Sequence, residues 1–501
     1  MNQDASQPEA VSLASLGLRP THGSARVEGI RGLSVDSREL RSGDLFAALP
    51  GSNVHGAVFV RDAIENGAAA VLTDPCGFEL AASDAPPEHI PFIVAENPRL
   101  ALSAAAARFF AKQPPTVAAV TGTNGKTSIA HFTRQIWERL GNRAANVGTL
   151  GIDGALRASL RHTTPDPVTL HGFLAAMREQ QVTHAVLEAS SHGLSQYRLD
   201  GVEFRAAAFS SFSRDHLDYH DDLDSYFSEK ARLFSQVLPA GGSVVVNLSA
   251  DRAGAVVGIA RGRGHDLFLI GRGGDGDLTI LDERFDETGQ SIRYAFQGRT
   301  AGLRLGLIGG FQAENVFVAA GLAIMCGEKP ERVLSVLDSL ETVPGRMQLA
   351  AVRDNGAAVF VDYAHTPDAL EVALRALRPH VRGRITVVFG AGGDRDPGKR
   401  CLMGAAAKRQ ADAVIVTDDN PRHEDPAEIR SEIMRGCPDA RNIGDRARAI
   451  LEGVVALDHG DALLVAGKGH EAGQVVGDDV HPFDDREQAS LAVAALDGKR
   501  T

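Results

Sequence analysis

The sequence contains few cysteines, few aromatic residues and no long apolar runs. Its four cysteines, Cys76, Cys326, Cys401 and Cys437, lie far apart and form no C-x-x-C pair. This spacing excludes a zinc site built from a cysteine cluster and a disulfide scaffold. One Trp and five Tyr in 501 residues leave few aromatic platforms for ligands. Because scarce, scattered thiols fit a reducing compartment, we expect a cytoplasmic protein.

An excess of basic residues is also missing. Lys and Arg total 52 against 64 for Asp and Glu, so the formal net charge is −12. Such a chain is a poor candidate for general binding to nucleic acids or anionic membranes. No uninterrupted apolar run of about 18 residues occurs, and residues 1–10 lack a signal-peptide pattern. We therefore expect no nucleic-acid partner and no membrane insertion.

The length and two proline-containing joints indicate several domains. At about 150 residues per domain, 501 residues correspond to two to four domains. Pro114-Pro115 follows an Ala-rich helical pattern, and Thr342-Val343-Pro344-Gly345 follows a helical pattern over 331–340. Since proline disfavours helix at the residue before it, both joints predict helix ends. The resulting segments are 1–113, 114–342 and 343–501.

The second and third segments alternate Val/Ile/Ala-rich runs with helical patterns, which is typical of parallel α/β sheets. In the second segment, a strand over 116–120 leads through a glycine loop into a helix that ends at Gly141. Asn355-Gly356 predicts a hairpin turn in the third segment. Its predicted strands cover 357–362, 385–389, 413–417 and 462–466. The first segment is less regular, and we predict a small mixed α/β domain there.

The strongest chemical signal is the run Thr121-Gly122-Thr123-Asn124-Gly125-Lys126-Thr127-Ser128 between a strand and a helix. Glycines let the backbone wrap a phosphate, and the helix N-terminus adds N–H donors and a favourable dipole. Lys126 would neutralise the β- and γ-phosphates, and Thr127 would offer its hydroxyl to Mg²⁺. The standard phosphate loop has four residues before Gly-Lys, whereas only Thr123 and Asn124 stand here. A chance glycine-rich turn is the alternative.

Two further motifs carry candidate metal ligands. Glu188 follows a predicted strand over 183–187, where a carboxylate near a phosphate loop suits Mg²⁺. The alternative for this motif is a helix N-cap at Ser190 or Ser191. His216, in Asp215-His216-Leu217-Asp218, is a candidate ligand of a second metal, and Lys230 follows it on a helix. Spacing alone favours a solvated acidic loop and a surface lysine.

Together with Gly310-Phe311-Gln312-Ala313-Glu314-Asn315, these motifs resemble the central domain of the Mur ligases. That family comprises the ATP-dependent amino-acid-adding enzymes of peptidoglycan synthesis, and the shortened glycine loop is its own form. The resemblance covers nearly the whole chain and implies an α/β protein of three domains. These are a small UDP-sugar-binding domain (1–113), a central P-loop-type ATPase with a mostly parallel sheet (114–342), and a Rossmann-like amino-acid-binding domain (343–501).

Other segments resemble one branch of the family, the ligases that make the UDP-MurNAc-tripeptide. They are Val35-Asp36-Ser37-Arg38, Asp362-Tyr363-Ala364-His365-Thr366-Pro367-Asp368 and Gly467-Lys468-Gly469-His470-Glu471. Asp419-Asn420-Pro421-Arg422 is similar to the motif of the branch that adds meso-2,6-diaminopimelate. The implied reaction joins this amino acid to the D-Glu γ-carboxylate of UDP-MurNAc-L-Ala-D-Glu through an acyl phosphate. The implied cofactors are ATP, as co-substrate, and Mg²⁺, and we expect a monomer.

The resemblance also implies roles for individual residues. Nucleotide contacts are implied for Gly122, Thr123, Asn124, Gly125, Lys126, Thr127, Ser128, Asn315, Arg346 and Asp362. The implied metal ligands are Thr127, Glu188, His216 and Lys230 as a carbamate, and the catalytic set is Lys126, Glu188, His216 and Lys230. Ser37, Ser52 and Asn53 would face the UDP, and Thr163, Thr164, Ser190, Gln196 and Arg198 the muramoyl dipeptide. The incoming amino acid would meet Arg395, Asp419, Asn420, Arg422, Gly467 and Glu471.

Several alternatives stay open at this point. Glu471 and Arg395 could form a surface ion pair, and Arg422 could be a solvent-facing turn residue. A folylpolyglutamate-synthetase-like ligase would share the ATPase core but lack the UDP-facing domain and the Asp-Asn-Pro-Arg motif. A regulatory ATPase would hydrolyse ATP without the sugar-peptide.

Overall fold

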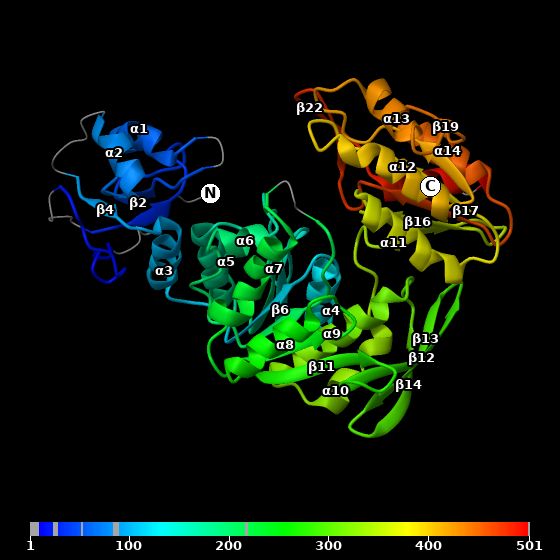
Figure 1. Cartoon of the computed structure of the whole chain (residues 1–501), viewed down its shortest axis with the longest axis horizontal. Helices are drawn as coiled ribbons and strands as arrows, with labels where there is room; N and C mark the ends of the chain where they lie inside the picture. Colours follow the sequence, from blue (N-terminus) through cyan, green and yellow to red (C-terminus); the bar gives the residue numbers. More distant parts are fainter. Residues whose placement is uncertain (1–9, 24–28, 52–53, 84–89, 216–218, 499–501) are drawn as a thin grey trace. The chain divides into compact units, whose positions relative to one another are not determined.

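The computed structural model describes residues 10–23, 29–51, 54–83, 90–215 and 219–498 (Figure 1). The chain forms two compact units, Met1–Leu269 with Val318–Pro330, and Ile270–Phe317 with Glu331–Thr501. Strand β11 (Asp266–Arg272) and helix α9 (Phe311–Met325) run from one unit into the other. No helix in the described ranges is both long and apolar enough to cross a bilayer.

The first unit begins with a small sheet in the order β1-β2-β3-β4, with every pair parallel. Leu45, Val71 and Leu72 of this sheet are completely buried, so its strands form the centre of a small core. The prediction of a small α/β domain is confirmed. Its elements are β1 (Gly32–Ser34), β2 (Asp44–Ala47), α1 (Val60–Glu65), β3 (Ala70–Thr73), α2 (Pro75–Ser83), β4 (Phe92–Val94) and α3 (Pro98–Phe110).

The main sheet of the first unit has the order β10-β9-β5-β8-β6-β7 and is parallel except for β7. Helix α4 packs Ile129, Phe132, Ile136 and Trp137 into the core, and Gly141 follows its end with φ +94°. Because the parallel strands share one carboxyl edge, the loops after β5, β6 and β8 lie together there. The elements are β5 (Thr116–Thr121), α4 (Lys126–Arg139), β6 (Ala144–Gly148), β7 (Gly151–Gly154), α5 (Pro167–Glu179), β8 (His184–Glu188), α6 (Ser191–Ser195), β9 (Ala206–Phe209), α7 (Leu223–Arg232), β10 (Ser243–Asn247) and α8 (Ala253–Gly262).

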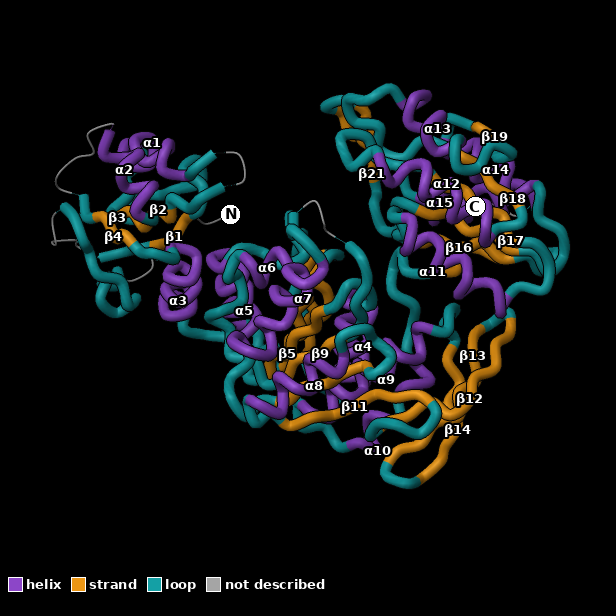
Figure 2. Tube along the Cα trace, in the orientation of Figure 1, coloured by secondary structure: helices purple, strands orange, loops and turns teal. Residues whose placement is uncertain are grey.

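The second unit contains an antiparallel meander, whose strands belong to a ten-stranded sheet, and a six-stranded sheet that is larger than the meander (Figure 2). The meander consists of β12 (Leu278–Asp286), β13 (Gly289–Phe296) and β14 (Arg299–Leu305). The larger sheet has the order β15-β16-β20-β17-β18-β19, and only β15 is antiparallel. Its strands are β15 (Gln348–Val352), β16 (Ala358–Asp362), β17 (Ile385–Phe389), β18 (Ala413–Val416), β19 (Arg441–Asn442) and β20 (Ala462–Ala466).

Helices cover this larger sheet, whose side chains alternate between two hydrophobic clusters. Phe360 and Leu464 belong to one cluster, whereas Val361 and Val465 belong to the other. A sheet buried on both faces explains the nearly continuous apolar runs of its strands. The covering helices are α11 (Pro367–Leu377), α12 (Gly398–Gln410), α13 (Pro426–Met434), α14 (Arg446–Val455) and α15 (Asp485–Leu496), and a hairpin of β21 (Gly473–Val476) and β22 (Asp479–Pro482) adds to them.

The α/β fold class and the strands of the second and third segments are confirmed, as is the turn at Asn355-Gly356 between β15 and β16. The continuous helix predicted over 331–340 is wrong. Only α10 (Pro330–Leu334) and a 3₁₀ turn (Leu337–Ser339) form there. The hydroxyls of Ser335 and Ser339 bond to the carbonyls three residues before them, which competes with a continuous helix.

Candidate active site

The glycine loop after β5 is held in shape by its own lysine and by the segment after β9. Gly122 has φ +148° and Gly125 has φ +86°, conformations that favour glycine. Lys126 Nζ donates to the carbonyls of Gly122 (2.9 Å) and Thr123 (2.8 Å). Ser211 Oγ accepts from the Asn124 N–H at 2.9 Å. The loop therefore presents the N-terminus of α4 in a phosphate-loop arrangement, so the chance-turn alternative is not supported.

Beside this loop lies Glu188, at the carboxyl end of β8 and only 1% exposed. Its carboxylate accepts hydrogen bonds from Thr127 Oγ1 (3.0 Å), the Thr149 N–H (2.9 Å) and Thr149 Oγ1 (3.2 Å). A Cβ added at Gly148 would lie 1.9 Å from Glu188 Oε1, so this glycine leaves the space that the carboxylate fills. Ser190 also caps α6 by accepting from the Gly193 N–H at 3.0 Å. The N-cap at Ser190 is therefore confirmed, and the metal-ligand role of Glu188 stays a prediction.

Lys230 reaches the same loop from α7. Its side chain is 1% exposed, and Nζ donates to the Gly122 carbonyl at 2.9 Å and lies 4.4 Å from the centre of the Tyr226 ring. Burial and the nearby charge of Lys126 lower the pKa of Lys230 well below its usual value. The alternative of a surface lysine is wrong. His216 lies outside the described residues, as do Ser52 and Asn53.

The residues predicted to hold the dipeptide continue from Glu188. Thr164 Oγ1 donates to the Glu188 carbonyl at 2.7 Å and accepts from the Ser190 N–H at 3.0 Å. Arg198 donates to the Thr164 carbonyl (2.6 Å) and to Gln196 Oε1 (2.7 Å), and burial lowers its pKa. A further contact, between the hydroxyls of Thr163 and Thr149 (3.1 Å), ties this group to the donors of Glu188. The five dipeptide residues are thus contiguous.

Ser37 lies outside the hydrogen-bond network of the dipeptide residues. It follows β1, is 8% exposed, and its carbonyl accepts from Asn66 Nδ2 at 3.1 Å. No hydrogen bond among the described residues links it to the dipeptide group.

In the second unit, Arg346 lies just before β15, and Asp362 is the last residue of β16. Asp362, at the end of β16, accepts from the N–H groups of Met347 (2.6 Å) and Ala364 (2.9 Å), and burial raises its pKa. The Arg346 guanidinium lies 4.5 Å from the centre of the Tyr363 ring. Asn315, in α9, is 8% exposed and donates to Gln312 Oε1 at 3.0 Å.

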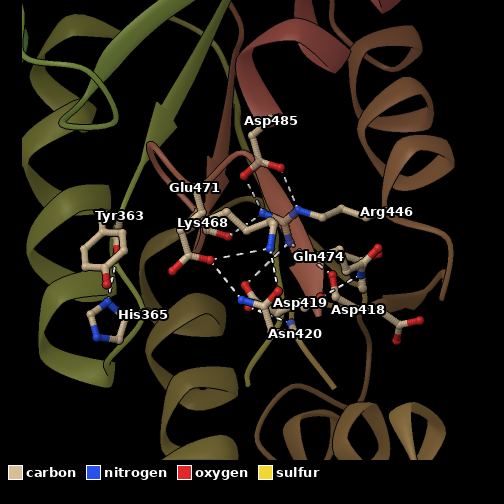
Figure 3. A network of polar contacts seen from close by, with 12 residues as sticks. Tyr363, His365, Asp418, Asp419, Asn420, Arg446, Lys468, Glu471, Gln474 and Asp485 are labelled. Carbon is tan, nitrogen blue, oxygen red and sulfur yellow. Dashed lines mark hydrogen bonds and ion pairs between the residues drawn. The ribbon is translucent and has the colours of Figure 1, made fainter. Parts of the chain in front are cut away.

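The loops after β18 and β20 form a polar network (Figure 3). Asn420 Nδ2 donates to Glu471 Oε2 at 2.9 Å, and Asn420 Oδ1 accepts from Lys468 Nζ at 2.8 Å. Asp419 lies against Gly467, because a Cβ added at Gly467 would be 2.6 Å from Asp419 Oδ2. Four of the six residues predicted to select the amino acid are therefore brought together.

Arg422 and Arg395 frame the same loops. Arg422 is half-buried, has φ +50°, and donates from Nη1 to the Gly393 carbonyl at 2.8 Å. Its backbone is held by β21, with Arg422 N–H to Val475 O at 3.1 Å, so backbone and side chain both tie Arg422 to the neighbouring loops. Arg395 is exposed. Glu471 approaches Lys468 at 3.5 Å, and no Arg395–Glu471 ion pair occurs among the described residues.

Comparison with known proteins decides the family. Three family models match: "Mur ligase family, catalytic domain" over residues 29–110, "Mur ligase middle domain" over 120–323, and "Mur ligase, glutamate ligase domain" over 345–469. A protein of Bradyrhizobium diazoefficiens named UDP-N-acetylmuramoyl-L-alanyl-D-glutamate--2,6-diaminopimelate ligase is 48% identical over 472 residues, 93% of this chain and 95% of that one. The chain belongs to the Mur ligase family.

Two more Mur ligases agree with this assignment. A protein of the same name from Agrobacterium fabrum is 46% identical over 472 residues, 94% of each chain. A solved structure of a ligase with this name is 33% identical, has a TM-score of 0.70 and covers 97% of this chain and 99% of its own. The likeness extends over the full three-domain Mur ligase architecture.

The donor chemistry of this Mur ligase suits Mg²⁺, which prefers oxygen ligands and keeps several waters. The Thr127 hydroxyl and the Glu188 carboxylate provide such oxygens beside the glycine loop. Within the described ranges, no group of three or more His, Cys, Asp or Glu side chains is arranged to hold a metal ion. These two oxygens are therefore the described groups at the glycine loop whose chemistry fits the ion.

Sequence reasoning missed two buried cations of the Mur ligase network, Lys468 and Arg446. Both side chains are 0% exposed. Lys468 stands between two glycines directly after a strand, a signal that the motif contained. Arg446 follows Asp445 at the start of an ordinary amphipathic helix, and nothing in its local sequence distinguishes it from a solvated helix residue.

Proposed function

We propose that this Mur ligase joins meso-2,6-diaminopimelate to the D-Glu γ-carboxylate of UDP-MurNAc-L-Ala-D-Glu, with cleavage of ATP to ADP and phosphate. The observation that carries the proposal is the contiguous path from Lys126 through Glu188 to the Thr164–Arg198 group. Along this path the glycine loop lies beside a buried carboxylate and a set of polar groups suited to a carboxylated peptide, which supports the proposal. The curated relatives with this named activity support it.

The first step activates the acceptor. A γ-carboxylate oxygen attacks the γ-phosphorus of ATP, the bond to the β-phosphate oxygen breaks, and an acyl phosphate and ADP result. Lys126 and the N–H groups of its loop would hold the phosphates, and Thr127 and Glu188 would hold Mg²⁺. When bound, the ion supplies positive charge to the transferring phosphoryl group. Catalysis by these residues is positioning and electrostatic stabilisation.

The second step forms the amide. A deprotonated amine of diaminopimelate attacks the acyl carbon, and the tetrahedral intermediate expels phosphate. Thr163, Thr164, Ser190, Gln196 and Arg198 would orient the dipeptide, while Ser37 would face the UDP. The amino acid would be held by Arg395, Asp419, Asn420, Arg422, Gly467 and Glu471, and the nucleotide also by Asn315, Arg346 and Asp362.

Lys230 would act as a carbamate. Its depressed pKa favours the neutral amine, whose nitrogen can attack the carbon of CO₂ and lose a proton. The product is an anion, which together with His216 would serve a second Mg²⁺ where an ammonium would repel it. We further propose domains of 1–113, 114–342 and 343–501, and a cytoplasmic monomer.

An ADP-release assay tests the proposal. With ATP, Mg²⁺ and UDP-MurNAc-L-Ala-D-Glu, we expect turnover when meso-diaminopimelate is added and little with lysine or without an amino acid. Equal ADP release without the sugar-peptide would favour a regulatory ATPase. Turnover with a folate and glutamate instead would favour the folylpolyglutamate-synthetase-like alternative. Mass spectrometry of the UDP-linked product gives an independent identification.

A further inference from the structure

A buried ion pair lies directly beneath the loops after β18 and β20. Arg446 is the first residue of α14 and Asp485 the first residue of α15, and both side chains are 0% exposed. The carboxylate accepts from Arg446 Nε at 2.7 Å and from Nη2 at 2.6 Å. This paired, charge-assisted geometry fixes the plane of the guanidinium.

Arg446 also donates to two backbone carbonyls, and Figure 3 shows its guanidinium between Asp485 and the Asp418–Asn420 loop. Nη2 donates to Ala466 O at 3.0 Å, and Nη1 donates to Asp418 O at 3.2 Å. These carbonyls belong to the residues immediately before Gly467 and Asp419. In the sheet order, β17 separates β20 from β18, so one guanidinium connects the carboxyl ends of two strands that do not pair with each other.

The pair is a poor device for stability alone. Removing two charges from water costs several kcal/mol, and apolar pairs of similar volume are often as stable or more stable. A cation in the first turn of α14 also opposes the helix dipole. A role in holding the two loops explains these unfavourable choices, because an apolar pair could not bind the two carbonyls.

The loops that Arg446 holds approach each other very closely. Asp419 Oδ2 is 4.0 Å from Arg446 Nη1, and the missing Cβ of Gly467 leaves room for the same carboxylate. The Asn420 amide is fixed from the other side by Lys468 Nζ and by the Val475 N–H (2.9 Å). A small shift of either carbonyl would therefore move residues assigned to the amino acid.

We propose that Arg446, oriented by Asp485, is a positioning residue for the amino-acid site, a role that rests on the proposed function. Because its side chain is 0% exposed, it acts through the two loops and not on the substrate itself. It sets the spacing between Asp419 and Gly467, so it determines the affinity for the incoming amino acid and has little effect on ATP or the sugar-peptide.

The test replaces the whole pair, because Arg446→Ala alone would leave a buried, uncompensated carboxylate and could unfold the protein. Arg446→Met/Asp485→Leu keeps volume and removes both charges. We expect a folded enzyme whose KM for diaminopimelate rises about tenfold or more, since a misplacement of about 1 Å can cost as much as about a hundredfold. The KM values for ATP and the sugar-peptide should stay within about twofold.

A matched control lies at the opposite edge of the same sheet. Arg353 pairs with Asp497 at 3.0 Å beyond the end of β15, next to the amino end of β16. Arg353→Met/Asp497→Leu should change the melting temperature without selectively raising the KM for diaminopimelate. Asp485→Asn is a second variant for the case that the double variant does not fold, because asparagine keeps the shape of the aspartate side chain. It should raise the KM for diaminopimelate about threefold, since a neutral amide binds Arg446 more weakly.

The outcomes are distinct. Wild-type enzyme that does not use diaminopimelate would refute the proposed function, whatever the variants do. Wild-type enzyme that uses it, combined with an unchanged KM in the folded double variant and in Asp485→Asn, would overturn the positioning role. An equal rise in all three KM values would do the same, because it would indicate a general structural effect.

Discussion

Arg422 offers the sharpest test of amino-acid selection, because its side chain and its backbone have separable tasks. The backbone is held by Arg422 N–H to Val475 O (3.1 Å) and by Gly477 N–H to Arg422 O (2.7 Å), and neither bond needs the side chain. The guanidinium donates to the Gly393 carbonyl at 2.8 Å. Arg422→Ala therefore removes the guanidinium while the hydrogen bonds that shape the loop remain.

Two magnitudes follow for this substitution. Loss of the bond to Gly393 should reduce the free energy of unfolding by about 1 kcal/mol. Diaminopimelate differs from lysine by one extra carboxylate, and a charge-assisted hydrogen bond to such a group contributes about 2 kcal/mol. Since 1.4 kcal/mol corresponds to a factor of ten, we expect kcat/KM for diaminopimelate to fall about thirtyfold. Lysine, which lacks that carboxylate, should be used as poorly as before.

Steady-state ADP release with both amino acids measures these values. Arg422→Lys keeps the charge without the planar fork and should recover only part of the loss. Arg435→Ala, an exposed arginine at the end of α13, is the control and should behave as wild type. Equal losses for both amino acids would show that Arg422 only supports the loop, and a wild-type preference for lysine would refute the selection argument.

Three further expectations concern the first unit. Lys126→Ala should lower kcat by a hundredfold or more, about 3 kcal/mol, with an unchanged circular dichroism spectrum; a folded variant with near-normal activity would contradict its phosphate role. Lys230 should show a carbamate signal by ¹³C NMR after exposure to ¹³C-bicarbonate, and Lys230→Arg should not. Burial lowers the pKa of His171 to about 4, so the unfolded chain protonates first and stability is lost as the pH falls from about 6.5 to about 4. Urea titrations should show that the free energy of unfolding falls by about 3 kcal/mol more than that of His171→Leu over this pH range. The same pH dependence of the free energy of unfolding in both proteins would contradict this expectation.

The strands and the glycine loop could be predicted because their signals are local. The strand over 385–389 is a continuous apolar run between turns, and β17 occupies those residues. The burial of Lys230 could not be predicted from its local pattern, since its partner, the Gly122 carbonyl, lies 108 residues earlier in the chain. Lys is rarely buried without such a partner, so the local pattern correctly favoured the surface on average.

The same reason explains the missed pair. Arg446 and Asp485 are 39 residues apart, and each looks like an ordinary residue in the first turn of a helix. Their connection exists only after α14 and α15 pack on the sheet. The roles of the site residues, His216 among them, stay predictions that the experiments above address.

The position of the Glu188 carboxylate depends on the absence of a side chain at Gly148. A methyl at this position would overlap the Glu188 carboxylate, yet the contacts found for it come from that side chain and not from the backbone of the sheet. Gly148→Ala would thus push Glu188 away from Thr127 and Thr149 while the strands stay paired. On the proposed role of Glu188, this one replacement separates folding from activity, because it displaces the carboxylate and leaves the backbone of the sheet untouched.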